Sequence, residues 1–592
     1  MKERYLIGLF LSLLLLCSTA CIDTVPDEVL AYSDFYTGVN DADNAILGLY
    51  GQFMELAGQT VVLNELRADL LDVTNHATID LQEINLNAPS PNNPWTNVSR
   101  FYGVIQTCND LLYNLDIMLK ENKIIQAEYG ERYADVAALR TWIYFQLGIH
   151  FGQIPYITQP VVTIDNLNRY KNSELSLNDL LPELIRCMES LPTLENYQSS
   201  PLVQQSLDGY SLAPYFIDKR CLLGDLYLFN NDYEKAAVIY RQVLAVDEDL
   251  SADVREQYRK NRLYCYPWTS GGTPDWFEIL YTDGKNHDSG SLYNAWRNMF
   301  AATTTGRTAL EEMIWFIAYD SKFAPAYPFL ELFNPVGNNG GKYYLKPSDY
   351  AVDSVWGGEI QKNGYPFDAR GLTGAYRETG GEHYVMKYSC FEETPSGDVR
   401  GNWFLYRAAL LHLRYAEAAN RAGYPKLAWA IVNDGLGTGG SAFLYKKENG
   451  DNYPDDSIRI TGNSPFDLYP EPYFFDGRQC DQPWIRSPWR SNGGVRGRAN
   501  LPNVPFPEDA ITQQDSIRFV EKLIIREAAL ELGFEGNRWQ DLLRIARRLN
   551  RETPGEGTRF LWDDNIRKKY ERSGISGTNL SSEEKWFLPL YR

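Results

Sequence analysis

A stretch near the C-terminal end, residues 517–549, constrains the fold more than any other part of the chain. Its apolar residues recur at helical spacing on both sides of Gly533, which predicts two amphipathic helices that form a hairpin. Because glycine enters the left-handed conformation without steric cost, we expect Gly533 to end the first helix in that conformation. The apolar positions are Ile517, Val520, Leu523, Ile524, Ala528 and Leu532, then Trp539, Leu542, Leu543, Ala546 and Leu549.

Charged residues alternate with the apolar positions of this hairpin. The acids are Glu527, Glu531, Glu535 and Asp541, and the bases are Arg526, Arg538 and Arg544. Two interpretations are open: the carboxylates are paired for catalysis, or the charges form an ion network that locks the two helices together. No nucleophile or histidine accompanies the acids, so we favour a partly buried structural network and expect no catalytic residue.

The same stretch resembles the signature of the SusD/RagB family of outer-membrane nutrient-binding lipoproteins. That family carries the pattern E-x-x-x-E-L-x-F-E-G-x-R-x-x-D-L-x-R late in the chain. The matching positions here are Glu527, Glu531, Leu532, Phe534, Glu535, Gly536, Arg538, Asp541, Leu542 and Arg544. The resemblance implies a mostly α, SusD-like fold, in which tetratricopeptide-like helical hairpins pack against an irregular, loop-rich lobe.

Three further stretches resemble parts of the same fold. Residues 131–155 contain a long helix followed by Phe151-Gly152-Gln-Ile-Pro155, where the family has F-G-x-(V/I)-P. Residues 220–244 and 407–436 each contain two short helical segments with small residues at the expected helix crossing, which is typical of tetratricopeptide units. The C-terminal Trp586-Phe-Leu-Pro-Leu590 is only loosely similar to the P-I-P that usually closes the family's sequences.

These stretches predict how the chain is divided. We expect a signal peptide at 1–20, a tether at 21–40 and a single SusD-like domain over 41–592. Its helical scaffold would cover about 41–250, 401–436 and 514–550, where helical periodicity is strong. The loop-rich lobe would cover about 251–400 and 437–513, where glycine, proline, asparagine and aromatic residues are frequent.

The net charge of the chain is −20, which argues against a nucleic-acid-binding role because no basic field exists to displace counterions from phosphates. Aromatic residues make up 14% of the chain, with 40 Tyr and 14 Trp. Most of these rings will be core, but an excess of this size suggests that some are exposed. Exposed rings suit the apolar faces of sugars and of peptide side chains.

Cysteine and histidine give no sign of a metal or a cofactor. The eight cysteines are scattered without a C-x-x-C pair, and the five histidines lie far apart in the sequence. Zinc sites and thiol–disulfide sites need closely spaced ligands, so we expect neither.

The N-terminus has the pattern of an export signal. The apolar run from Leu6 to Leu16 follows a basic start and is shorter than the roughly 20 residues that span a bilayer. Ser18-Thr19-Ala20-Cys21 then resembles a bacterial lipoprotein box, which implies lipidation of Cys21. The alternative is an ordinary secretory signal cut near Ala20.

Family members that bind glycans use exposed aromatic residues from the early proline-rich loop and from the loop-rich lobe. Stacked rings supply contact area, and polar side chains supply orientation. By this resemblance, the predicted ligand-binding residues are Trp95, Trp268, Trp276, Tyr281, Trp296, Trp315 and Arg370. Packing in the core is the alternative for each aromatic residue.

The resemblance implies a non-enzymatic, surface-exposed lipoprotein anchored in the outer membrane. Such a protein binds oligosaccharides and delivers them to a SusC-like, TonB-dependent transporter in the same membrane. Three alternatives remain open: a peptide-binding member of the family, a secreted polysaccharide hydrolase, and a tetratricopeptide-like scaffold that binds another protein.

Overall fold

The computed structural model describes residues 35–161, 173–197, 200–204, 206–207, 210–245, 263, 300, 312–362, 364, 366–372, 374–388, 399–433, 435–436, 469–475, 494–507, 509 and 512–591. The predicted signal peptide and the predicted lipidation site, Cys21, lie outside these residues. So do four predicted ligand contacts, Trp268, Trp276, Tyr281 and Trp296.

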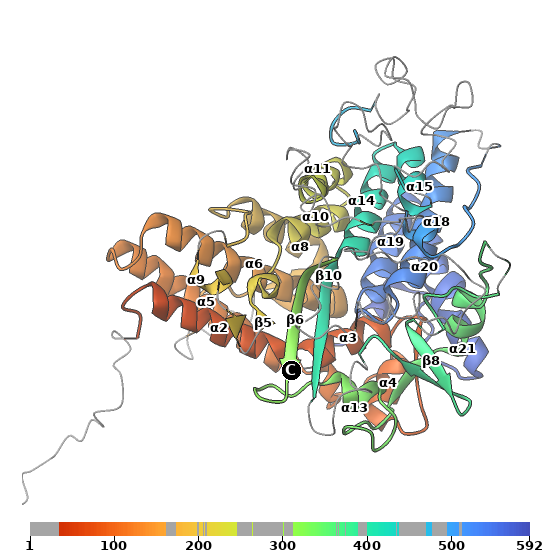
Figure 1. Ribbon diagram of the computed structural model, residues 1–592, viewed down its shortest axis with the longest axis horizontal. Coiled ribbons are helices and arrows are strands. Elements are labelled where there is room, and N and C mark those ends of the chain that lie inside the picture. Colours follow the sequence, from red (N-terminus) through yellow and green to blue (C-terminus); the bar gives the residue numbers. More distant parts are fainter. Residues whose placement is uncertain are drawn as a thin grey trace, which may run out of the picture.

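Helices dominate the described chain, as the sequence predicts (Figure 1). The N-terminal part contains α2 (Val39–Met54), α3 (Ala57–Glu65), α4 (Ile79–Asn85), the short 3-10 turn η2 (Pro94–Thr96), α5 (Ser99–Lys120) and α6 (Gln126–Phe151). α2 packs against α5 and α6, which also pack against each other. α6 is buried along most of its length and ends at Gly152, where φ is 74°.

A second group of helices extends this packing toward the C-terminal hairpin. It contains α8 (Leu177–Glu189), α10 (Lys219–Phe229), α11 (Tyr233–Leu244), α14 (Ala408–Arg421), α15 (Pro425–Val432), α18 (Gln513–Leu532) and α19 (Arg538–Glu552). α10 packs against α11, α11 against α14, and α14 against α15 and α18. The two-helix units predicted at 220–244 and 407–436 are therefore present.

The predicted close crossing of α10 and α11 is confirmed at Gly224. A Cβ atom on this residue would lie 2.3 Å from Cε1 of Tyr240, so only glycine lets the two helices approach this closely. The Tyr240 hydroxyl donates a 2.5 Å hydrogen bond to Asp225 on the facing helix.

The strands of the described residues form two-stranded antiparallel sheets. The longest pair is β6 (Met313–Asp320) with β10 (Arg400–Arg407), which lies between the N-terminal and C-terminal helices (Figure 1). The shorter pairs are β1 (Leu71–Val73) with β7 (Leu345–Pro347), β2 (Gln153–Pro155) with β3 (Glu174–Ser176), β4 (Ser206–Leu207) with β5 (Tyr210–Ser211), and β8 (Tyr376–Thr379) with β9 (Glu382–Val385).

Short helices complete the described chain. They are α9 (Pro201–Gln204), η3 (Ala213–Tyr215), α13 (Phe329–Phe333), η5 (Ala351–Trp356), α17 (Val495–Arg498), α20 (Glu556–Leu561), η6 (Trp562–Ile566), α21 (Arg567–Ser573) and η7 (Glu583–Trp586). α20 packs back on α19, and α17 packs on α15 and α18.

The hairpin of α18 and α19 is present, but its turn differs from the prediction. Gly533 ends α18 with φ −50° and ψ 132°, so it is not left-handed. The left-handed residues are Phe534 and Gly536, with φ values of 75° and 85°. Glycine is needed at 533 for space instead, because a Cβ atom there would lie 2.9 Å from Cζ2 of Trp356.

Candidate functional site

The charges of the hairpin belong to a buried ion network, as predicted, and Glu531 lies near its centre. Its Oε2 lies 2.9 Å from Nη1 of Arg370, and its Oε1 lies 2.8 Å from Nη1 of Arg407 and also contacts Arg498. Burial alone would raise the pKa of Glu531, but Arg498, Arg407 and Arg370 outweigh it and lower the pKa.

Among the residues that the structure describes, the network joins equal numbers of acids and bases. The acids are Glu312, Glu359, Asp368, Glu527, Glu531 and Glu535, and the bases are Arg370, Lys387, Arg407, Arg496, Arg498 and Arg526. All except Arg526 are buried. Each of these carboxylates therefore has a basic partner, which fits the structural interpretation of the hairpin charges.

Most partners come from outside the hairpin, which the sequence did not show. Arg407 ends β10, Arg496 and Arg498 lie on α17, and Arg370 precedes β8. The other signature arginines bind different elements: Nε of Arg538 lies 2.7 Å from Oδ1 of Asp69, and Nη2 of Arg544 lies 2.6 Å from Oε2 of Glu417 on α14. The signature thus fastens the hairpin to the rest of the scaffold.

Glu65, at the end of α3, anchors the hairpin turn from the other side. Its Oε1 accepts hydrogen bonds from the backbone N–H groups of Gly536 and Asn537 at 2.7 and 2.9 Å, and its Oε2 accepts from Phe534 at 3.1 Å. Burial raises the pKa of Glu65 to about 7, and these backbone donors limit that rise. No sequence pattern points to this role, because Glu65 lies far from the hairpin along the chain.

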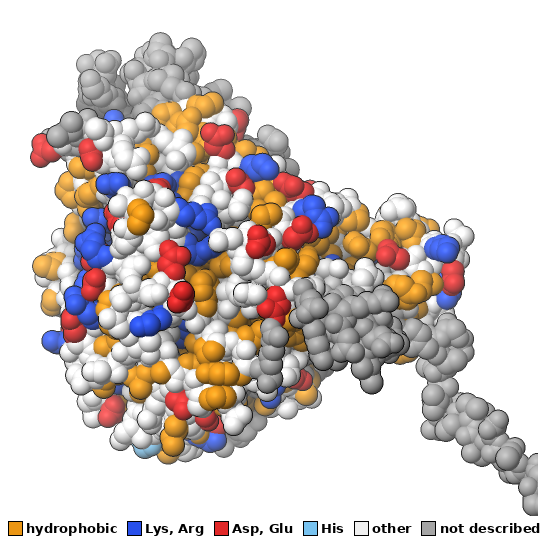
Figure 2. All heavy atoms as spheres, turned by 180° about the vertical axis from the view of Figure 1, so that it is seen from behind, with side chains coloured by type: hydrophobic (Ala, Val, Ile, Leu, Met, Phe, Trp, Pro, Cys, Tyr) orange, Lys and Arg blue, Asp and Glu red, His pale blue; other side chains and the backbone are white. Residues whose placement is uncertain are grey.

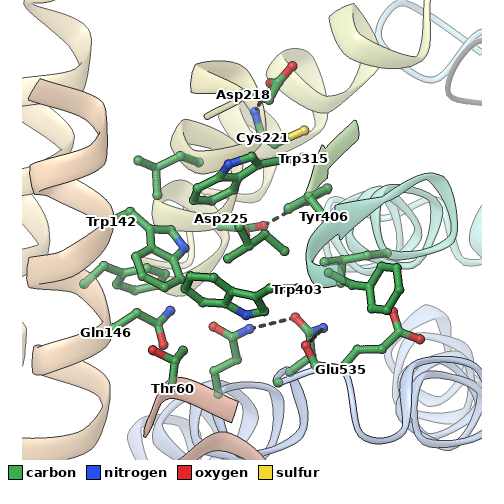
Figure 3. Close-up of a pocket in the computed structure, with 18 residues that line it drawn as sticks. Thr60, Trp142, Gln146, Asp218, Cys221, Asp225, Trp315, Trp403, Tyr406 and Glu535 are labelled. Carbon is green, nitrogen blue, oxygen red and sulfur yellow. Dashed lines mark hydrogen bonds between the residues drawn. The ribbon is translucent and has the colours of Figure 1, made fainter. Parts of the chain in front are cut away.

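A small cavity is enclosed by side chains from α3, α6, α10, β6, β10, α14 and the turn of the α18–α19 hairpin (Figure 3). Trp142, Trp315 and Trp403 line it together with polar side chains that include Gln146, Asp225 and Glu535. Its volume of about 30 Å³ is enough for about two water molecules but far below the roughly 300 Å³ of a small-molecule site. The cavity therefore belongs to the core.

Two predicted ligand contacts are corrected by their position. Trp315 is buried, stacks on Phe53 with an interplanar angle of 6°, and donates from Nε1 to the Tyr215 carbonyl. Arg370 is fully buried, and its guanidinium group is occupied by Asp368, Glu527 and Glu531. Neither side chain is open to a ligand in this conformation, because packing and ion pairing enclose them.

Trp95 is half-buried and lies on a firmly held backbone. The backbone N–H of Trp95 donates to Oδ1 of Asn93 at 2.9 Å, and its backbone carbonyl accepts from Nε2 of Gln59 at 2.7 Å. Asn93 in turn donates from Nδ2 to the Asp80 carbonyl and to Glu83, both at 2.9 Å. The backbone around Trp95 is therefore held by hydrogen bonds, and the partly exposed residue packs against the core.

In the part of the chain that the structure describes, no cluster of His, Cys, Asp and Glu is arranged to hold a metal ion. Within the same residues, no helix has the length and apolar character needed to cross a membrane. On the face seen from behind, acidic and basic side chains are interspersed with hydrophobic ones (Figure 2).

Comparison with known proteins gives a consistent result. The SusD family model matches residues 489–590, which include the hairpin. SusD-like protein P2 from Formosa agariphila is 24% identical over 290 residues, which are 47% of this chain and 53% of that protein. The matched region thus spans about half the length of this curated relative.

Solved structures match over nearly the whole chain. A SusD superfamily protein from Bacteroides vulgatus aligns with a TM-score of 0.53 and 16% identity, covering 94% of this chain and 96% of that one. Surface glycan-binding protein A from Bacteroides uniformis aligns with a TM-score of 0.54 and 14% identity, covering 93% and 96%. At these identities the likeness is one of fold.

Proposed function

This chain is SusD-like in its C-terminal region and in its fold, and we propose that it captures oligosaccharides at the cell surface. In this proposal Cys21 carries the lipid anchor in the outer membrane, and the protein hands its ligand to a SusC-like, TonB-dependent transporter. The protein performs no chemistry on the ligand.

The position of Trp95 carries the proposal. An indole ring that is partly exposed on a hydrogen-bonded turn offers a flat apolar face with little conformational freedom to lose on binding. Asn92 and Asn97 are exposed on either side of it and bring amide groups that can bond sugar hydroxyls. This combination of a ring and nearby amides suits a sugar better than an apolar ligand.

The state of the acidic residues supports a binding role over hydrolysis. A glycoside hydrolase needs two carboxylates on opposite sides of an accessible bond. The carboxylates of the signature are instead buried and paired with arginine and lysine. Among the described residues they hold the fold together.

Calorimetric titration of the full chain with a panel of neutral hexasaccharides tests the proposal. We expect at least one saccharide to bind and Trp95→Ala to weaken that binding about tenfold or more, as stacked aromatic anchors do. Trp562→Ala removes another half-buried tryptophan, and it should leave the affinity unchanged. Equal affinity of the wild type and Trp95→Ala would overturn the role of Trp95, and release of shorter sugars during the titration would favour a hydrolase.

A further inference from the structure

A surface groove lies where the C-terminal segment 583–591 meets the end of α6 and the β2–β3 pair. Its volume is about 570 Å³, within the roughly 300–1,000 Å³ of small-molecule sites. Apolar side chains from Phe151, Phe587 and Leu590 line it together with the polar groups of Gln153, Glu174 and Lys585. None of these residues was singled out as a ligand contact from the sequence.

The walls of the groove are held in place by hydrogen bonds. The N–H of Leu588 donates to the His150 carbonyl at 2.8 Å, and Nη2 of Arg67 donates to the Trp586 carbonyl at 2.7 Å. At the far end, the Tyr591 hydroxyl donates to the Pro89 carbonyl at 3.0 Å. The groove is therefore formed before any ligand arrives, which reduces the entropic cost of binding.

Gly152 brings the two walls together. A Cβ atom on this residue would lie 2.6 Å from Cγ of Phe587, so the Phe587 ring rests directly on the glycine. The F-G-x-I-P motif and the C-terminal Trp586-Phe587-Leu588-Pro589 are thus in contact, although they lie at distant points of the sequence. The Phe587 ring stays partly exposed and offers an apolar face to the groove.

The polar groups of the groove suit hydroxyl groups. The exposed Gln153 side chain donates from Nε2 to Oε2 of Glu174 at 2.9 Å, which leaves its amide oxygen as an acceptor. Glu584 and Lys585 are exposed, and neither forms an ion pair with another residue that the structure describes. An ammonium donor, carboxylate acceptors and an amide beside a phenyl ring match the pattern of donors and acceptors on a sugar.

We infer that this groove is a second saccharide site, which takes one or two units of a neutral oligosaccharide. The inference rests on the proposed function, because it assumes that the chain's ligand is a saccharide. An anionic ligand fits less well, since Glu174 and Glu584 place two carboxylates against one ammonium group. Asn87 also lines the groove.

Hydrogen–deuterium exchange of the full chain with the same hexasaccharide panel tests the inference, because it locates each contact. We expect a saccharide to protect peptides from 583–591 as well as peptides around Trp95. Protection at 583–591 should persist in Trp95→Ala and be lost in the double variant Gln153→Ala/Lys585→Ala. The double variant should also weaken overall affinity about tenfold, and Lys522→Ala, a change of an exposed lysine on α18, should not.

The outcomes separate this inference from the proposed function. Protection around Trp95 alone, with no effect of the double variant, leaves the proposed function standing and overturns the groove site. Protection at the groove alone, lost in the double variant, supports the groove and removes Trp95 from the ligand site. If a tryptic peptide mixture protects the groove peptides and no saccharide does, both the proposed saccharide capture and the saccharide groove are overturned. The groove is then a peptide site.

Discussion

The guanidinium group of Arg407 holds the carboxylate of Glu535 with two hydrogen bonds, from Nε to Oε2 at 2.7 Å and from Nη2 to Oε1 at 2.9 Å. This bidentate contact joins the end of β10 to the turn of the α18–α19 hairpin. The charged residues of the SusD-like signature therefore join the hairpin to the rest of the fold. Their contribution to stability can be tested by substitution.

Arg407→Met should strongly destabilise the protein, because it leaves Glu531 and Glu535 buried without their central partner. Loss of one partner of a buried ion pair costs about 3–5 kcal/mol. Arg526→Ala removes a basic residue that is 52% exposed and should cost less than about 1 kcal/mol. Urea unfolding of both variants measures the difference, and equal midpoints would show that the network contributes little.

Glu65→Gln should remove part of the pH dependence of stability. The pKa of Glu65 is raised to about 7 in the folded state, mainly by burial, against an ordinary value of 4.5. The contribution of Glu65 to the free energy of unfolding is fully present below about pH 4.5 and is lost as the pH rises through about 7. The wild type should therefore lose on the order of 1–3 kcal/mol across this window relative to Glu65→Gln. Free energies of unfolding that change with pH in the same way in both proteins would contradict the raised pKa of Glu65.

His150→Gln should reduce the loss of stability that occurs as the pH falls, whereas Glu65→Gln reduces the loss that occurs as the pH rises. Burial lowers the pKa of His150 well below 6.5, and the neighbouring Arg67, whose Nη1 lies 3.3 Å from Nδ1, lowers it further. Stability from the neutral imidazole is present above about pH 6.5 and is lost as the pH falls toward the folded pKa. The variant should lose less stability than the wild type between pH 6.5 and 5, as denaturant titrations at each pH can show.

Gly152→Ala should destabilise the protein more than Gly574→Ala. Both residues have positive φ, 74° and 67°, so both variants carry a backbone penalty of about 1–2 kcal/mol. Only Gly152 also faces the Phe587 ring, since nothing lies within 4 Å of a Cβ atom on Gly574. The extra clash should add about 1–3 kcal/mol, and a smaller loss for Gly152→Ala would mean that Phe587 moves away freely.

Two helix glycines should respond with opposite signs when changed to alanine. Gly224→Ala places a methyl group against Tyr240 and should destabilise the α10–α11 pair by about 1–3 kcal/mol. Gly103→Ala, on α5, meets nothing within 4 Å and should stabilise the protein by up to about 1 kcal/mol through helix propensity. Thermal unfolding of the two variants distinguishes these effects, and a stabilised Gly224→Ala would disprove the close crossing.

The sequence predicted the hairpin and its two-helix neighbours because their signals are local. Apolar spacing, a glycine at the helix end and small residues at crossings all lie within a few turns of one another. The predicted left-handed conformation of Gly533 was wrong, because its φ is −50°. The glycine is needed for space beside Trp356, a contact that depends on tertiary packing. Local rules show where a helix ends but not what lies beside its end.

The site was less predictable because its contacts are distant in sequence. Arg407 and Glu531 are separated by 124 residues, so no pattern around either residue points to the other. Arg370 and Trp315 looked suitable for a ligand by residue type alone, yet ion pairing and stacking bury them. The groove combines residues near 151–174 with residues near 578–590, which only the folded chain brings together.

Surface capture and delivery are tested most directly by purifying the full, tagged chain from native outer membrane and identifying what co-purifies by mass spectrometry. We expect a large β-barrel transporter as the partner and a bound oligosaccharide that Trp95→Ala no longer retains. If the protein emerges alone and without ligand, from wild-type and variant cells alike, the proposed capture and delivery are wrong.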